Sequence, residues 1–441
     1  MASLGYLWLL DRLNESKVVR GERFFFGAPT LTPGREPESL ESATPLRVCD
    51  LIAVSLSYEL DVLNLIRILE EADIPPLACD REAEHPLVLI GGPLTRANIE
   101  LLRPFGDAVV HGDGEPAMDA LLESLRGGTT TKEGWLSVLK DAPGVVIGDG
   151  DPGVAHCAGA EVLPVVSPML APECSLGNLL LVEVSRGCPQ SCHFCIGRRQ
   201  NSAMRWADTD TLLSKIPEWA PGLGIIGAAV SYHPGLKEML RFAAQRELPV
   251  GLSSLRADKA DAEIMGLLAR TGSSVLTIAA DGPSQAVRDR IEKRITEEDL
   301  LKAAALAGEA GLKSLKLYAI YGFPGETDDD LMELASLANT MNRSLPVTLS
   351  VNVLIPKKET PLESAPFVTV KEANRRFSVL KRNLSGGVRL NAESPKEAAM
   401  QTLLSHATRD DAPKLVELAH TRASAADWRA VFGERFRTLE R

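Results

Sequence analysis

Three cysteines stand within eight residues of one another: Cys188, Cys192 and Cys195, in the spacing C-x3-C-x2-C. Three thiolates on one short loop can hold three irons of a cubane 4Fe-4S cluster, and the fourth iron is then left without a protein ligand. An iron with an open position can bind a second cofactor or a substrate. The chemistry that we expect first is therefore that of an open-coordinated iron-sulfur cluster.

Two other ligand chemistries fit the same three cysteines. They could bind a structural zinc ion together with His193 or a distant histidine. They could also hold a closed redox cluster if Cys157 or Cys174 folded back as a fourth ligand. The chain has seven cysteines in all, and their clustering indicates metal ligation rather than a disulfide framework. Outside that alternative, the sequence assigns no role to Cys157 or Cys174, nor to Cys49 or Cys79.

The segment around the three cysteines, EVSRGCPQSCHFCIGRRQ, resembles the radical S-adenosylmethionine (SAM) superfamily. The signature of that family has this spacing with an aromatic residue before the last cysteine, a position held here by Phe194. The resemblance implies that the cysteines ligate a 4Fe-4S cluster and that SAM chelates its fourth iron. It also implies that an external one-electron donor, such as flavodoxin or ferredoxin, reduces the cluster, which cleaves SAM to a 5′-deoxyadenosyl radical.

Polar residues follow the second and third of the strands that we predict in this region. In GAAVSYHP (227–234) the resemblance implies that the backbone and Ser231 bind the amino group of SAM. In GLSSLRAD (251–258), Ser253 and Arg256 stand at a strand end and are expected to face SAM. His233 could carry a proton at the mouth of the barrel. A surface histidine beside a proline is the alternative.

The resemblance extends to the ends of the fourth and fifth predicted strands. In TIAADGPSQAVRDRI it implies that Asp281 binds the ribose of SAM, and that Ser284 and Arg288 lie near its carboxylate. The segment KLYAIYGFPGET is similar to the family's GLPGET-like turn, which implies that the backbone of Gly322 and Phe323 lies beside the adenine. As an alternative, such turns follow any barrel strand, and an aspartate at a strand end often caps the next helix.

The elements that must position these residues follow one another regularly. Six short apolar runs lie between residues 178 and 356, and each is followed by a loop or an amphipathic helical pattern. This alternation is typical of parallel strands covered by helices. Six consecutive units favour a partial (β/α)6 barrel, whose chemistry lies at the carboxyl ends of its strands.

A second α/β pattern precedes the barrel, over residues 48–126. Its strand-like runs end in small residues, which is typical of an open doubly wound sheet with a ligand site at the strand ends. The domain resembles the Rossmann-like cobalamin-binding domain of one radical SAM subgroup, which includes proteins of undefined activity, through the runs SLSYEL and IGGP. The resemblance implies that Ser55, Gly91 and Gly92 contact cobalamin.

One feature of that subgroup has no counterpart here. The Asp-x-His-x-x-Gly signature, which supplies the lower axial histidine of cobalamin, is absent. The only histidines before residue 150 are His85 and His111. Two interpretations stay open: cobalamin binds without that ligand, or the domain keeps the fold and has lost the cofactor.

These patterns divide the chain into five segments. They are an N-terminal arm (1–47), the cobalamin-binding-like domain (48–126), a linker rich in Gly, Pro and Asp (127–177), the radical SAM barrel (178–365) and a helical C-terminal region (366–441). The predicted fold class is therefore α/β, with an N-terminal doubly wound domain, a partial (β/α)6 barrel and a small helical region.

The composition excludes several classes of function. The chain has 48 Lys and Arg against 59 Asp and Glu, a formal charge of −11, so we do not expect it to coat nucleic acid. It has neither a run of about 18 apolar residues nor a basic start before an apolar stretch. We therefore expect no membrane span and no secretory signal, and we place the protein in the cytoplasm.

Together these observations predict an enzyme that cleaves SAM reductively and, with cobalamin, transfers a methyl group to a carbon or phosphorus centre of a small molecule. A methylthiotransferase acting on RNA or protein is the second interpretation. It needs a second cluster from three amino-terminal cysteines, and only Cys49 and Cys79 precede the linker. A non-catalytic iron-sulfur module for electron transfer is the third interpretation, and it leaves the ordered set of barrel turns unexplained.

Overall fold

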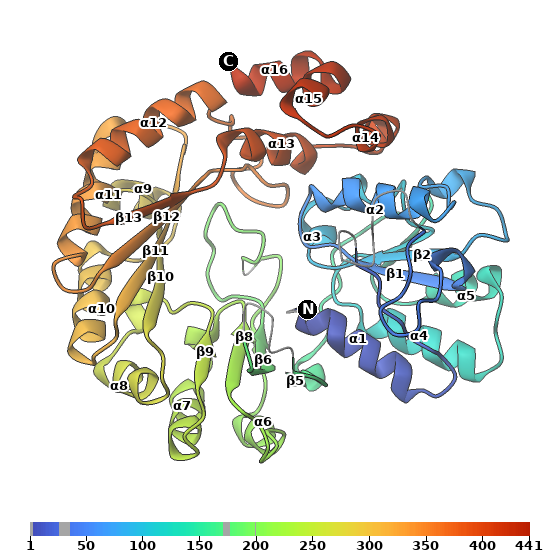
Figure 1. Cartoon of the computed structure of the whole chain (residues 1–441), viewed down its shortest axis with the longest axis horizontal. Coiled ribbons are helices and arrows are strands. Elements are labelled where there is room, and N and C mark those ends of the chain that lie inside the picture. Colours follow the sequence, from blue (N-terminus) through green and yellow to red (C-terminus); the bar gives the residue numbers. More distant parts are fainter. Residues whose placement is uncertain (1–2, 26–35, 171–176, 199) are drawn as a thin grey trace.

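A computed structural model describes residues 3–25, 36–170, 177–198 and 200–441. Figure 1 shows two lobes, an N-terminal α/β domain and a half-open barrel, with C-terminal helices extending across both. Cys174 lies outside the described residues. Among the helices of these ranges, none is both long and apolar enough to span a bilayer.

The N-terminal domain is built on a four-stranded sheet in the order β1-β2-β3-β4. The first three strands are parallel and the fourth is antiparallel: β1 (Leu51–Ser55), β2 (Leu87–Gly91), β3 (Ala108–Val110) and β4 (Val145–Ile147). Its helices are α2 (Asp61–Glu71), α3 (Leu94–Asn98), α4 (Glu115–Arg126) and α5 (Lys132–Leu139). One face of the sheet packs on α2 and the other on α4 and α5, which is the predicted doubly wound arrangement.

The barrel contains the six predicted parallel strands. They are β6 (Leu180–Arg186), β8 (Leu223–Gly227), β9 (Val250–Leu252), β10 (Val275–Asp281), β11 (Ser314–Tyr321) and β12 (Val347–Val353). The helices between them are α6 (Thr209–Ser214), α7 (Leu236–Gln245), α8 (Ala262–Arg270), α9 (Gln285–Arg290), α10 (Glu297–Glu309) and α11 (Asp328–Met341). The largest apolar core lies between the outer faces of the strands and these helices.

Four short strands come from segments for which no strand was predicted. β4 and β5 (Val165–Val166) belong to the predicted linker, β7 (Arg205–Trp206) ends the cysteine loop, and β13 (Arg389–Ala392) lies in the C-terminal region that was predicted to be helical. β13 extends the barrel because it runs parallel to β12. Strands of two to four residues carry too few side chains to show a period in the sequence, and partners distant in the chain define them.

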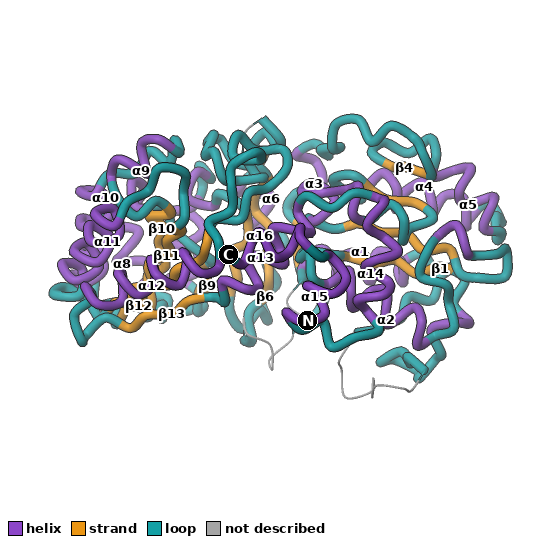
Figure 2. Tube along the Cα trace, turned by 90° about the horizontal axis from the view of Figure 1, so that it is seen from above, coloured by secondary structure: helices purple, strands orange, loops and turns teal. Residues whose placement is uncertain are grey.

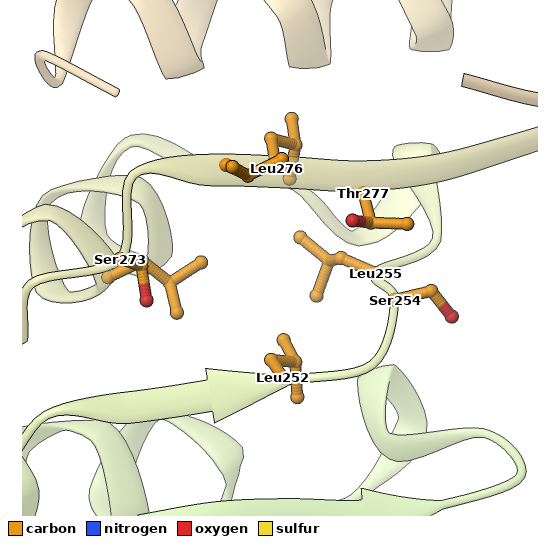
Figure 3. Close-up of a pocket in the computed structure, with 8 residues that line it drawn as sticks. Leu252, Ser254, Leu255, Ser273, Leu276 and Thr277 are labelled. Carbon is orange, nitrogen blue, oxygen red and sulfur yellow. The ribbon is translucent and has the colours of Figure 1, made fainter. Parts of the chain in front are cut away.

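The barrel wall is split between β9 and β10, so that it consists of two half-sheets. A backbone hydrogen bond from Leu255 N to the Thr277 carbonyl (2.9 Å) bridges the split. A small pocket lies there, lined by side chains of both half-sheets (Figure 3). The first half-sheet has the order β5-β6-β8-β9 and the second β10-β11-β12-β13.

The two ends of the chain cross between the lobes. The first helix, α1 (Leu4–Glu15), packs on β5 and β6 of the barrel. The C-terminal helices are α12 (Val370–Asn383), α13 (Pro395–Ser405), α14 (Ala412–Ala419), α15 (Ala425–Phe432) and α16 (Glu434–Glu440). In Figure 2, α13 and α16 lie over the centre of the molecule and α14 lies beside α2. Trp428 and Phe436 are fully buried in a core shared with α2, so this region joins the N-terminal domain to the barrel.

Candidate functional site

The three predicted cluster ligands lie on a loop that leaves β6 and returns as β7. Gly187, directly after β6, has a φ of 73°, and a side chain there would collide with the carbonyl oxygen of Ala203. Only glycine lets the loop fold back this closely. The amide of Cys188 donates to the Ser202 carbonyl (3.3 Å), which closes the loop. The thiols are therefore held at the carboxyl end of the first barrel strand.

The thiols of this loop influence one another electrostatically. Cys192 is buried, and burial raises the pKa of its thiol to about 11, with Cys195 adding to the rise. Burial also raises the pKa of Cys195, and Cys188 contributes in the same direction. The cation of Lys293 opposes both shifts. Such thiols lose their protons when a cation replaces them, as in a metal ligand set.

The described residues contain no group of three Cys, His, Asp or Glu side chains placed to hold a single metal ion. A mononuclear zinc site, one of the predicted alternatives, requires its ligands to converge on one point. In a cubane cluster each thiolate binds a different iron, so its ligands are spaced more widely.

The cysteine loop is anchored on the second half-sheet. The rings of Phe194 and Phe323 meet edge to face, 6.4 Å between centroids, and the amide of His193 donates to the Ile291 carbonyl (3.0 Å). Phe323 is buried in an apolar cluster with Val287. The predicted aromatic position thus packs on the turn that was predicted to lie beside the adenine.

That turn, residues 322–326, is closed by its own carboxylate. Gly322 has a φ of 92°, and its amide donates to both oxygens of Glu326 (2.9 Å each). Arg376 of α12 binds the same carboxylate at 2.9 Å. Burial raises the pKa of Glu326, although these donors oppose the rise. The turn is therefore rigid, and its backbone is held at the end of β11.

Asp281 ends β10 in the left-handed region, with a φ of 56°, where the register with β11 slips by one residue. Its carboxylate is paired with the ammonium group of Lys293, whose side chain is 10% exposed. Burial alone would lower the pKa of Lys293, but Asp281 raises it. Both charges also influence the Cys192 thiol: Lys293 lowers its pKa and Asp281 raises it. Lys293 was not predicted, because it lies in a loop that only the tertiary structure brings to the cysteines.

Ser231 and Arg256 are joined to each other. The Ser231 hydroxyl accepts from the Arg256 amide (2.9 Å), and the Arg256 guanidinium donates to Asp258 (2.8 Å) and lies over the ring of Tyr232. Ser253, on the preceding turn, is exposed. The ends of β8 and β9 are thus connected, and the roles of these residues toward SAM stay predictions.

Ser284 and Arg288 are engaged in the local fold. Ser284 caps α9 by accepting from Val287 N (3.1 Å) and donates to Asp330 (2.5 Å). Arg288 is completely buried and donates to the Gly282 carbonyl (3.3 Å), while its Nε atom has no partner. These contacts give both side chains a structural role, and their contact with SAM stays a prediction.

His233 requires a correction. The residue is buried, so it is not the surface histidine of the alternative interpretation. Its Nδ1 accepts from the Gly235 amide (3.0 Å), so the proton is on Nε2, which donates to the Ala207 carbonyl (3.1 Å). Burial lowers the pKa of the ring. Because both nitrogens are bonded to the backbone, the ring has no free nitrogen with which to carry a proton, contrary to our expectation.

One further polar group at this end of the barrel was not predicted. Ser185 is completely buried, and its hydroxyl has no hydrogen-bond partner. It faces Gly227 at the end of β8, where a Cβ would lie 2.5 Å from the hydroxyl oxygen. An unpartnered hydroxyl therefore packs closely against the Gly227 backbone, three residues before the first cysteine of the loop. Serine in a strand gives no signal in the sequence, so this pair was not recognisable there.

In the N-terminal domain the predicted residues lie at the ends of neighbouring strands. Ser55 is paired in register with Gly91, and Ser55 is exposed. Gly92 has a φ of 98°, and a Cβ there would lie 2.5 Å from the Leu56 carbonyl oxygen, so only glycine fits. Backbone atoms therefore pack directly against one another at the end of β2, with no side chain between them. His111 is buried and bonded to the Pro152 carbonyl (3.1 Å).

The residues that follow β3 contact the barrel lobe. Asp113 binds Arg96 of α3 (3.0 Å) and Arg205 of β7 (2.5 Å), and Glu115 binds Arg186 of β6 (2.7 Å). These carboxylates are half-buried or buried, and their pairs with Arg186 and Arg205 connect the N-terminal domain to the base of the cysteine loop.

Cys157 lies beside this network. Its thiol is 3.5 Å from the Arg96 guanidinium and donates to the Asn201 carbonyl (3.9 Å) at the far end of the cysteine loop. Cys49 is half-buried and Cys79 is exposed, each on its own loop of the N-terminal domain.

Comparison with known proteins defines the class. Residues 182–338 match the Radical SAM superfamily, and residues 5–147 match the family of N-terminal domains of radical SAM proteins. The matched segments contain the cysteine loop and the N-terminal sheet. The chain therefore belongs to the radical SAM superfamily.

Two curated relatives are similar over much of the chain. The uncharacterized protein MJ0966 of Methanocaldococcus jannaschii is 26% identical over 373 residues, which are 83% of this chain and 80% of the relative. The uncharacterized methyltransferase PH0819 of Pyrococcus horikoshii is 23% identical over 286 residues, 59% of each chain.

Two solved structures share the fold. The radical SAM methyltransferase TsrM from Kitasatospora setae, with cobalamin and a [4Fe-4S] cluster bound, has a TM-score of 0.57 and 14% identity over 86% of this chain and 89% of TsrM. The cobalamin-dependent SAM radical enzyme OxsB has a TM-score of 0.54 and 16% identity over 88% of this chain and 54% of OxsB. The likeness confirms the predicted fold class, a Rossmann-like domain joined to a radical SAM barrel.

Proposed function

We propose that this radical SAM enzyme cleaves SAM at a 4Fe-4S cluster held by Cys188, Cys192 and Cys195, and transfers a methyl group to a small molecule with the help of cobalamin. The observation that carries the proposal is the convergence of the three thiols and the Asp281–Lys293 pair at one end of a barrel joined to a Rossmann-like domain.

The donor set fits the cluster. Three thiols on one loop provide one ligand for each of three irons, and the chain offers no fourth thiol on that loop. Burial raises the pKa of Cys192 and Cys195, so deprotonated thiols need cationic partners there. Irons would supply that charge, and Lys293 adds to it.

The surroundings of the cysteine loop fit SAM. The unpartnered hydroxyl of Ser185 beside Gly227 offers a polar contact for a ligand on the first half-sheet. On the second half-sheet, Asp281 and Lys293 offer one charge of each sign, which suits the ribose hydroxyls and the carboxylate of SAM. The closed turn at Gly322 leaves backbone beside Phe323 for the adenine.

The N-terminal domain fits cobalamin in part. The exposed Ser55 and the tight turn at Gly92 resemble a corrin-binding strand end, and TsrM and OxsB are described with cobalamin bound. The Asp-x-His-x-x-Gly signature is absent, so we propose that cobalamin binds without the axial histidine of that signature. PH0819, a relative, is described as a methyltransferase, which supports the same reaction.

When bound, the cluster supplies the electron that cleaves SAM, and cobalamin supplies the carrier of the methyl group. The residues of the chain bind, orient and shield these groups. Phe194 and Phe323 keep water from the loop through their edge-to-face contact. Arg96, Arg186 and Arg205 hold the N-terminal domain at the base of the cysteine loop, so that two cofactors could face each other. An external electron donor of the flavodoxin or ferredoxin kind would deliver the electron.

The test is anaerobic reconstitution of the full chain. We expect four irons per chain, a corrin absorption band after incubation with cobalamin, and 5′-deoxyadenosine after reduction with SAM. The variants Cys188→Ala, Cys192→Ala and Cys195→Ala should each lose the cluster, whereas Cys79→Ser, an exposed cysteine outside the site, should keep four irons. Retention of four irons in the triple variant would overturn the ligand assignment.

The same measurements separate the alternative functions. Eight irons per chain would favour a methylthiotransferase, which carries a second cluster. Four irons with no 5′-deoxyadenosine would favour an electron-transfer module. Four irons and 5′-deoxyadenosine without a corrin band would remove cobalamin from the proposal and leave radical chemistry in place.

A further inference from the structure

The inner face of the second half-sheet carries two rows of side chains that the proposed cofactors do not use. Residues in register on parallel strands point to the same face, and the core-facing residues alternate with these. The row further from the cysteine loop is Thr277, Lys316, Thr348 and Arg389, and the next is Ala279, Tyr318, Ser350 and Asn391. We call these eight residues the polar wall. Two of them are cations and none is acidic.

The cations of the polar wall have no acidic partner. Among the described residues, no carboxylate lies within ion-pair distance of Lys316 or Arg389. The chain has a net charge of −11 and pairs most of its half-buried arginines, so the half-buried Lys316 is unusual in having no carboxylate partner, and the exposed Arg389 lies on the same face.

Part of the polar wall is accessible to ligands, and its lysine points toward the cysteine loop. Arg389 and Asn391 are exposed, Tyr318 is 36% exposed, and Lys316 is half-buried. The Lys316 ammonium lies over the Tyr318 ring, 4.7 Å from its centroid. Because Tyr318 is two residues nearer the carboxyl end of β11, the lysine points toward the end of the barrel that holds the cysteines.

Lys316 and Arg389 flank one hydroxyl. Thr348 is in register with both, so the two cations lie on strands on either side of it, about 10 Å apart between Cα atoms. Long side chains from both sides can converge on a group placed over Thr348. We propose that the polar wall binds an anionic group of the substrate, a carboxylate or a phosphate, through Lys316, Arg389 and the Thr348 hydroxyl.

The geometry also sets the size of the substrate. Asp281 on β10 lies two strands away from Thr348 and three residues further along the sheet, so an anion over Thr348 lies about 14 Å from the Asp281–Lys293 pair. The inference rests on the proposed function, since it places the anion of the same small molecule that the radical would modify. The substrate class that follows is a small anionic molecule whose reacting centre is separated from its charge by about that distance.

The test is equilibrium binding to the cluster-loaded full chain by isothermal titration calorimetry, with three probes of similar shape: phenyl phosphate, benzoate and benzyl alcohol. We expect the two anions to bind and the neutral alcohol to bind at least roughly tenfold more weakly. Tighter binding of phenyl phosphate would identify a phosphate substrate, and tighter binding of benzoate a carboxylate substrate. Equal binding of all three probes, or binding of none, would overturn the proposal.

Variants assign the binding to the polar wall. Lys316→Met and Arg389→Met should each weaken the binding of the two anions by roughly tenfold, whereas Lys316→Arg should keep most of the affinity. The matched control, Lys302→Met with Arg382→Met on exposed positions of α10 and α12, removes the same charge and should leave binding unchanged. Unchanged anion affinity in Lys316→Met and Arg389→Met would overturn the assignment, and thermal unfolding of each variant checks its fold.

The two proposals fail independently. Anion binding needs no reduction and no cleavage of SAM, so it can be measured when the radical reaction is absent. Loss of iron from a polar-wall variant would point to a structural effect, whereas loss of anion binding with four irons retained supports the inference.

Discussion

The two halves of the barrel wall are built from the same strand and helix units, yet their inner faces differ. In the first half, Leu181 of β6 faces inward and packs with Leu4 of α1, with Trp8 and Ile226 beside them. In the second half, the inner face is the polar wall, where Tyr318, Arg389 and Asn391 are exposed and most of the other residues are half-buried. One half is therefore closed by apolar packing, and the other is left open.

Glycines explain the closed half. A Cβ at Gly224 would lie 2.6 Å from Leu181 Cδ2, and one at Gly251 would lie 2.5 Å from Leu179 Cδ1. Leu181 of β6 and Leu179 just before that strand thus spread over two strands that have no inward side chain at these positions. The half that carries the cysteine loop is filled by apolar packing on its inner face, whereas the open half has polar side chains there that can contact a ligand.

The largest expected effect tests this difference directly. Leu181→Asp should reduce the free energy of unfolding by about 4 kcal/mol, because it buries a charge in an apolar cluster. Thr348→Asp, in the open half, should reduce it by less than about 1 kcal/mol, since water reaches the polar wall. Denaturant unfolding of both variants measures the two values, and equal losses would remove the distinction between the halves.

The closed half also carries the contact with the N-terminal domain. Asp113→Asn should weaken the link between the lobes by about 3 kcal/mol, because Arg96 and Arg205 lose a shared carboxylate. The control Asp119→Asn breaks an exposed ion pair with Arg12 and should cost at most about 0.5 kcal/mol. Limited proteolysis of the linker and thermal unfolding report the change. A variant that resists protease as well as the wild type would contradict this role.

His233, also in the closed half, predicts a pH effect. Burial lowers the pKa of its ring in the folded state, so below about pH 6.5 the unfolded chain binds more protons and the stability of the wild type falls as the pH falls. His233→Gln removes the titrating ring, so this variant should lose less stability than the wild type between pH 7 and pH 5. Urea unfolding at several pH values measures the slopes, and parallel slopes would show that the ring is not responsible.

The smallest expected effect belongs to the open half, at its cysteine end. Lys293→Met removes a cation beside Cys192 and should lower the midpoint potential of the cluster by about 50 mV, because the reduced cluster carries one more negative charge. Asp281→Asn should raise the potential, since it removes the opposing anion. Redox titration followed by electron paramagnetic resonance measures both shifts, and shifts of the same sign would exclude a charge effect.

The sequence was sufficient for much of the fold because the relevant signals are local. Six apolar runs with amphipathic segments between them defined the barrel strands, and the spacing of Cys188, Cys192 and Cys195 defined the cysteine loop. Phe194 was singled out by its place in the motif, and the structure gives it a partner in Phe323. Periodicity and motif spacing need only neighbouring residues.

Other parts of the site depended on contacts that no local pattern contains. Lys293 reaches Asp281 from a loop, and Ser185 meets Gly227 across two strands. His233 looked available in the sequence, but two backbone groups occupy its ring. The C-terminal helices were predicted as helices, whereas their packing on α2 depends on apolar faces that meet only in the folded chain.

By itself the sequence determined the type of the main elements of the two α/β domains and the cysteines available for a cluster, because side-chain period and spacing are properties of short segments. Tertiary structure alone decided which half of the barrel is closed and which is open. The register of β10 to β13 aligns Lys316 and Arg389 in one row, and the docking of α1 fills the opposite half. Register and docking are set by contacts between distant segments, which no single stretch of sequence specifies.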